Sequence, residues 1–199
     1  MKHLKMLGAV AVAAAALTAL SGVGTASADF ICTESNTPCG KAIASLESSL
    51  IGGTVRIKDE GGTVISTCSG SKLNVKKEFE GVGVRVGGAI TALTWTGCTA
   101  STVTVANGQM MIENKKGTTN GTLFSGKAGE IQITVGTLLG SCVFTTGLGT
   151  DLGAFAGGIN AAFQINAPLT RVSGPCLGKA TWEGEYQVTN HTAVYVHAS

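Results

Sequence analysis

Short runs in which apolar and polar residues alternate, separated by glycine-rich turns, occupy most of this chain. Residues 54–58 and 130–135 are the clearest, because β-branched residues take every second position in both. Comparable runs recur about every 8–12 residues, and no long helical segments come between them. The pattern predicts an all-β fold: an antiparallel β-sandwich, immunoglobulin-like or jelly-roll-like, that forms a single domain over residues 29–199.

Three local patterns qualify this picture. In residues 41–51 the apolar positions follow helical spacing, so one short helix is possible. Asn107-Gly108 lies between two strand-like runs and predicts a tight β-hairpin. Because proline has no N–H for a β-ladder, all three prolines of the mature chain are expected in loops: Pro38, Pro168 and Pro175.

The first 28 residues have the composition of a secretory signal peptide. Lys2 and Lys5 precede an apolar run over residues 6–20, and a small-residue cleavage site follows at residues 26–28. The apolar run is too short to span a bilayer, so no transmembrane segment is expected after cleavage. The segment predicts a secreted protein, extracellular or loosely associated with the cell envelope.

All six cysteines follow this segment, and they form an even set in a compartment that favours disulfides. Six cysteines can pair in many ways, and the sequence alone does not choose among them. The simplest hypothesis joins neighbours along the chain: Cys32 with Cys39, Cys68 with Cys98, and Cys142 with Cys176. The sequence therefore predicts a fold stabilised by three disulfides.

Charge argues against several classes of partner. Two of the 14 basic residues lie in the signal segment, which leaves 12 basic residues against 12 acidic ones. A mature chain without net charge has no electrostatic footprint for nucleic acid or anionic lipid. Its low charge and abundant glycine suit either an inert extracellular surface or a surface that contacts cell-wall carbohydrate or another surface protein, and composition does not separate the two.

Few residues are candidates for catalysis. His191 and His197 lie near the C-terminus, where we expect them to be exposed to solvent. Glu183 and Glu185 share one face of a predicted strand, and paired carboxylates could serve glycoside hydrolysis. The simpler interpretation makes this the solvated face. We therefore expect no catalytic residue, no cofactor and no metal site.

The aromatic residues are scarce and fall within strands. Trp182 and Tyr186 lie on the face opposite the two glutamates, and Trp95 lies in another alternating run. Positions of this kind are typical of a core. An exposed tryptophan beside polar groups would instead form a platform for stacking sugars.

Several motifs in the later part of the chain resemble those of uncharacterised secreted proteins of actinobacteria. They are Thr94-Trp95-Thr96-Gly97-Cys98, Gly140-Ser141-Cys142-Val143-Phe144, Gly174-Pro175-Cys176, the run from Ala180 to Val188, and Val194-Tyr195-Val196. The resemblance implies a bacterial source and a β-sandwich. It implies no activity and no site residues.

These observations favour a non-enzymatic structural or binding protein that works through its surface. One alternative is a secreted hydrolase that uses carboxylates on a sheet face. Another is a β-barrel porin of a mycolate-type outer membrane, suggested by the alternating strands and low charge. Three disulfides favour a small disulfide-linked core over the porin.

Overall fold

The computed structural model describes residues 29–36, 39–79, 85–100, 102–126 and 130–198. The predicted signal segment, residues 1–28, lies outside the described residues, as does Pro38. Within the described residues the structure contains strands and no helix. Among the described residues, there is no helix that is long and apolar enough to cross a membrane.

Antiparallel pairing joins the strands, and many of them, such as β3 and β9, form from alternating or β-branched residues. In chain order the strands are β1 (Phe30–Cys32), β2 (Ser45–Leu50), β3 (Val55–Asp59), β4 (Val64–Phe79), β5 (Arg85–Cys98), β6 (Val103–Ala106), β7 (Gln109–Asn114), β8 (Gly121–Ser125), β9 (Gln132–Thr137), β10 (Gly140–Thr145), β11 (Asp151–Ala156), β12 (Gly158–Ile159), β13 (Ala162–Ser173), β14 (Lys179–Val188) and β15 (Ala193–His197). The expected all-β fold is confirmed.

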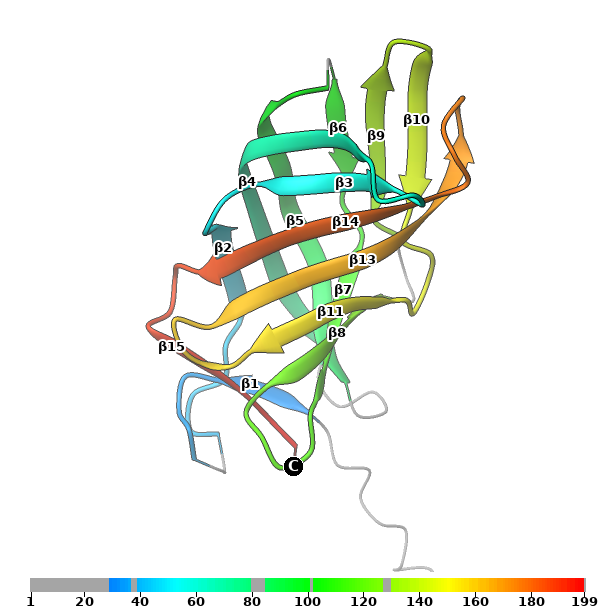
Figure 1. The fold of residues 1–199 in the computed structure, drawn as a ribbon. Helices are drawn as coiled ribbons and strands as arrows, with labels where there is room; N and C mark the ends of the chain where they lie inside the picture. The colour runs from blue at the N-terminus through cyan, green and yellow to red at the C-terminus, as the bar shows by residue number, and fades with distance from the viewer. Residues whose placement is uncertain (1–28, 37–38, 80–84, 101, 127–129, 199) are drawn as a thin grey trace, which may run out of the picture.

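The main sheet closes on itself. Pairing runs from β3 through β4, β5, β7, β8, β11 and β13 to β14, and β14 pairs in turn with β3. Strands β3, β14, β13 and β11 form one wall, and β5 and β7 run behind them at a steep angle (Figure 1). Two walls that cross in this way are the orthogonal form of sheet-on-sheet packing. The predicted disulfide-stabilised β-sandwich is confirmed in this form.

The core fills the space between the walls. Its largest fully buried side chains are Trp182, Tyr186, Phe144, Phe155 and Phe163. Four of the five come from β13, β14 and β11, the strands of one wall. Inward-facing residues alternate along β13 and β14, whereas a register shift in β11 separates its buried Leu152 and Phe155 by three positions.

The two ends of the closed sheet differ. A small separate sheet of β1, β15 and β12 covers one end, and Ile31, Val194 and Val196 are buried there. At the other end the β9–β10 hairpin projects from the body of the molecule (Figure 1). One end is therefore capped, whereas the other is open.

The predicted short helix at residues 41–51 is wrong. Residues 45–50 form β2, which pairs with β4 on one side and with β14 on the other. Leu46 and Ser48 point inward, and the Ser48 hydroxyl donates a hydrogen bond to the Leu73 carbonyl. The segment also has an alternating pattern, and two strand partners outweigh its local helical spacing.

Asn107-Gly108 does not form the predicted hairpin. Strand β6 pairs with β9, whereas β7 pairs with β5 and β8. The Asn107 carboxamide accepts a hydrogen bond from the Leu93 N–H, and the Gly108 carbonyl accepts one from the Ile90 N–H. Both residues are thus bound to β5, so the chain bends alongside β5 instead of reversing.

Pro168 lies within strand β13 and not in a loop as predicted, whereas Pro175 does lie in a loop. On one side Pro168 is opposite Thr181 of β14. On the other side, β11 pairs with residues 162–165 and β10 with residues 170–173. Pro168 falls between these two ladders, where no neighbouring strand requires its missing N–H.

The disulfides join cysteines that are neighbours along the chain, as predicted: Cys32–Cys39, Cys68–Cys98 and Cys142–Cys176. Cys68 and Cys98 lie directly opposite each other on β4 and β5, with their Cα atoms 3.8 Å apart. Cys142 is buried on β10 and anchors the loop that follows β13.

Candidate functional site

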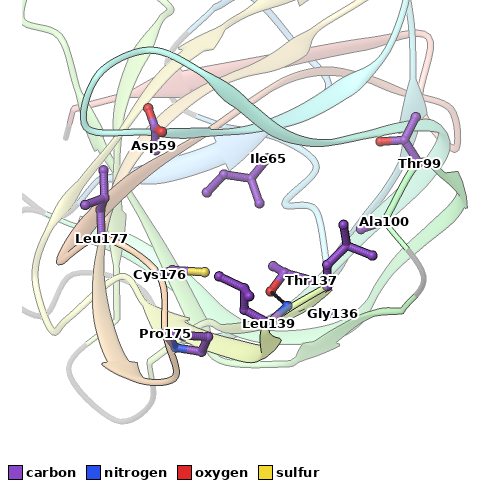
Figure 2. Close-up of a pocket in the computed structure, with 11 residues that line it drawn as sticks. Asp59, Ile65, Thr99, Ala100, Gly136, Thr137, Leu139, Pro175, Cys176 and Leu177 are labelled. Atoms are coloured by element: carbon purple, nitrogen blue, oxygen red, sulfur yellow. Dashed lines mark hydrogen bonds between the residues drawn. The ribbon is translucent and has the colours of Figure 1, made fainter.

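A pocket of about 760 Å³ lies at the open end of the closed sheet. Its walls come from the β3–β4 turn, the end of β5, the β9–β10 hairpin and the loop between β13 and β14. The lining residues are Asp59, Ile65, Thr99, Ala100, Gly136, Thr137, Leu138, Leu139, Pro175, Cys176 and Leu177. Figure 2 shows Asp59 and Leu177 on one side of the pocket and Thr99 and Ala100 on the other. A volume of this size is typical of sites that hold a small organic ligand.

The polar side chains of this pocket are already bound to backbone groups. The Asp59 carboxylate accepts hydrogen bonds from the N–H groups of Gly61 and Thr63, at 2.9 and 2.8 Å. The Thr99 hydroxyl oxygen accepts one from the Thr67 N–H at 3.0 Å. These bonds hold the turns in place, so the groups that remain to meet a ligand are largely apolar.

Thr137 holds the hairpin tip in the same way. Its hydroxyl donates to the Gly140 carbonyl at 2.7 Å and accepts from the Leu139 N–H at 3.3 Å, the second contact being drawn in Figure 2. The chain therefore reverses within Thr137–Gly140 and projects Leu138 and Leu139 at the tip.

Large apolar side chains at the mouth of the pocket are exposed to solvent. The relative exposure is 105% for Leu138, 83% for Leu139 and 57% for Leu177. Exposed apolar residues that gather in one place commonly mark a binding surface. Nothing in the fold requires leucine at the tip of a two-residue turn, where polar residues are usual.

The loop that carries Leu177 is anchored at two points. The Cys142–Cys176 disulfide ties it to β10. The Arg171 guanidinium donates hydrogen bonds to the carbonyls of Gly174 and Cys176. The wall formed by Pro175, Cys176 and Leu177 is thus held in position without a ligand.

The predicted carboxylate pair does not belong to this pocket. Glu183 forms an ion pair with Lys58 at 2.7 Å, across the β14–β3 ladder. Glu185 is exposed on the same strand. Glu183 is bound to a cation, so the geometry favours a structural role for this residue.

The two histidines differ from each other. The His191 ring nitrogen Nε2 lies 3.0 Å from the Ser45 carbonyl oxygen, and the residue is partly exposed. His197 is buried, whereas the sequence predicted an exposed residue. The reason is that β15 belongs to the cap sheet. The centroid of the imidazole lies 5.6 Å from that of the Phe30 ring and 6.3 Å from that of the Tyr195 ring. Its Nε2 lies 3.0 Å from the Glu34 carbonyl oxygen.

The aromatic residues predicted for the core lie there. Trp182 is within 5.7 Å of Trp95 and 6.3 Å of Tyr186, measured between ring centroids. Ser71 donates a hydrogen bond to the Tyr186 hydroxyl at 3.0 Å. The N–H groups of both indoles lie close to the same hydroxyl but outside hydrogen-bond geometry. Neither tryptophan is a platform for stacking sugars.

Alkaline pH is expected to destabilise the protein through Tyr186. Burial raises the pKa of this phenol to about 12, because desolvation outweighs the hydrogen bond from Ser71. The folded state therefore favours the neutral phenol, and the stability it confers is present below pH 10 and falls as the pH rises towards 12. The full loss, reached above pH 12, is on the order of 2–3 kcal/mol, and about half of it is expected between pH 9 and pH 11. Urea denaturation followed by circular dichroism at pH 9 and pH 11 measures it.

The Tyr186→Phe variant should lose less stability than the wild type between these two pH values. Tyr195→Phe is the matched control, because Tyr195 is partly exposed on β15. An equal pH dependence in wild type and Tyr186→Phe would contradict the assignment.

A second groove, of about 940 Å³, lies beside the cap and is polar: its lining includes Asn36, Asn114, Asn120 and Thr118. The Asn114 amide donates to the carbonyls of Val196 and Thr118, at 2.7 and 2.9 Å, and the Asn120 carboxamide oxygen accepts from the Gly157 N–H at 2.9 Å. The bond from Asn114 to Val196 joins the cap strand β15 to β7 of the main sheet.

Sequence reasoning did not find the open-end pocket. The available signal was Leu138-Leu139 between two strands, because adjacent leucines are unusual at a turn. Within the described residues, no group of three or more histidine, cysteine or acidic side chains could hold a metal ion.

Comparison with protein-family models, curated proteins and solved structures finds no match to this chain. The resemblance to secreted actinobacterial proteins therefore stays a prediction.

Proposed function

We propose that this protein is a non-enzymatic binding protein that works outside the cell or at the cell envelope, and that it holds an apolar ligand in the open-end pocket. One observation carries the proposal: the polar side chains of the pocket are bound to backbone groups, whereas leucines are exposed at its mouth. Burying those leucines against a ligand would remove apolar surface from water.

The chemistry of the pocket limits the class of ligand. Asp59 contributes a carboxylate, and two backbone N–H groups bind one of its oxygens, Oδ1. No lysine or arginine is among the described lining residues, so an anionic group inside the pocket would lack a dedicated partner there, and an unpaired buried charge is costly. The pocket therefore suits a neutral hydrocarbon portion, with any polar head left in solvent.

Two further features support this assignment. Three disulfides suit a protein that works in an oxidising compartment, which agrees with the proposed export. The ion pair of Glu183 with Lys58 agrees with a protein that binds without turning its ligand over.

Filling the pocket should abolish binding. We expect the neutral fluorescent probe N-phenyl-1-naphthylamine to bind the wild type and the Ala100→Trp variant to bind it at least tenfold more weakly. Ala100 lines the pocket, so an indole there would occupy its volume. Fluorescence titration in buffer without lipid measures the dissociation constants.

Ala154→Trp is the matched control, because Ala154 is exposed on β11 and lies outside the pocket lining. This variant should bind the probe like the wild type. If Ala100→Trp retains wild-type affinity, the pocket is not the binding site and the proposed function is wrong.

A further inference from the structure

The apolar rim of the pocket extends beyond its lining residues. In addition to Leu138, Leu139 and Leu177, Val172 near the end of β13 and Val64 at the start of β4 are exposed. We name these five residues the apolar rim. They lie at the start of β4, near the end of β13, on the β9–β10 hairpin and in the loop after β13, the elements that surround the open end (Figure 1).

The shape of the rim favours a lipid bilayer over a protein surface. Its most exposed residues lie at the tip of a narrow hairpin that projects from the body of the molecule (Figure 1). Stable protein interfaces are broad, and each partner contributes about 800 Å². A projecting tip with two adjacent leucines is better suited to entering the boundary between headgroups and acyl chains.

The charges beside the rim indicate which kind of bilayer surface it fits. Asp59 and Glu60 in the β3–β4 turn line a shallow groove together with Lys179, and Arg171 is exposed on β13. Two acids and two bases leave this end without a dominant charge. Such a surface complements zwitterionic headgroups, and docking would depend on apolar insertion and not on attraction to anionic lipid.

We propose that the apolar rim docks on a phospholipid bilayer and that the pocket accepts an acyl chain from it. This inference rests on the proposed function, since it names the class of ligand for the same pocket. Docking would place the mouth against the hydrocarbon, so that a chain could move into the pocket without crossing water. The exposed leucines would then leave water when the protein is docked.

Flotation with phosphatidylcholine vesicles tests docking directly. The wild type should float with the vesicles. Adding about 20% phosphatidylglycerol should change the bound fraction less than twofold, because docking is apolar. The Leu138→Asp variant should bind at least tenfold more weakly, since a carboxylate at the tip opposes insertion. Ile159→Asp is the matched control: Ile159 is 73% exposed on β12 in the cap sheet, and this variant should float like the wild type.

The two proposals can fail separately. Ala100→Trp fills the pocket but leaves the rim exposed, so it should still float although it no longer binds the probe. A wild type that stays out of the vesicle fraction, or a Leu138→Asp variant that floats normally, would overturn docking even if probe binding in buffer is intact. Sedimentation without vesicles tests whether the rim instead binds a second copy of the protein. If the wild type is a dimer and the Leu138→Asp variant is a monomer, the rim is a dimer interface, and docking on a bilayer is overturned.

Discussion

Replacing Trp182 with alanine is expected to lower the free energy of unfolding by about 3–5 kcal/mol, since it removes the largest buried side chain of the core. Trp182 is fully buried, and its ring lies beside those of Trp95 and Tyr186. It lies on β14, which pairs with β13, β3 and β2 and so closes the main sheet. A cavity at this position would loosen both walls at once. Urea denaturation followed by circular dichroism measures the loss.

Two further variants give this prediction a graded test. Trp182→Phe should lose less stability than Trp182→Ala, because it keeps an aromatic ring and removes an indole N–H that has no acceptor among the described residues. Glu183→Ala, one position along the same strand, should lose at most about 1 kcal/mol, as expected for an ion pair that is still partly open to solvent. Equal losses for Trp182→Ala and Glu183→Ala would contradict the position of the core.

Reduction of the disulfides is expected to lower the melting temperature by tens of degrees. The Cys68–Cys98 and Cys142–Cys176 bonds join residues that are 30 and 34 positions apart. In the chain-entropy model each contributes about 3–4 kcal/mol, and the shorter Cys32–Cys39 loop about 2 kcal/mol. Together these contributions are comparable with the whole stability of a typical domain, about 5–15 kcal/mol. Thermal unfolding with and without a reducing agent measures the effect.

Paired serine variants separate the three bonds. Cys68→Ser with Cys98→Ser should destabilise the fold more than Cys32→Ser with Cys39→Ser, because the first pair closes the longer loop. Intact mass should show six fewer hydrogens than in the fully reduced chain, one pair for each bond. An unchanged melting curve after complete reduction would show that the core does not depend on the disulfides.

Much of the fold could be predicted because its signals are local. Residues 54–58 and 130–135 alternate, and they lie in or beside β3 and β9. Pairing of neighbouring cysteines was also correct, because in an antiparallel fold consecutive segments often lie side by side, as Cys68 and Cys98 do on β4 and β5.

The errors occurred where a distant partner overrides the local pattern. Residues 45–50 become a strand because β4 and β14 lie on both sides of them. Asn107-Gly108 is bound to β5 and so does not form a tight reversal. His197 is buried because β1 brings Phe30 beside it. None of these partners can be identified from the few residues around each position.

The candidate site was the least predictable part. Asp59, Ala100, Leu139 and Leu177 come from four different connections and show no common motif. Their proximity follows from closure of the sheet, which brings the ends of β3, β5, β9 and β13 to one side. The glutamates that could be named in advance share a strand face, but this face lies outside the pocket.

By itself the sequence determined the all-β class and the aromatic core, because alternation and strand faces are properties of neighbouring residues. It suggested pairing of neighbouring cysteines as the simplest hypothesis, and the structure chose that pairing. Only the tertiary structure decided that the sheet closes, that a small sheet caps one end, and that leucines surround a pocket at the other. These features depend on pairing between strands that are far apart in the sequence. The sheet closes, and so has two ends, only because β14 pairs with β13 on one side and with β3 on the other.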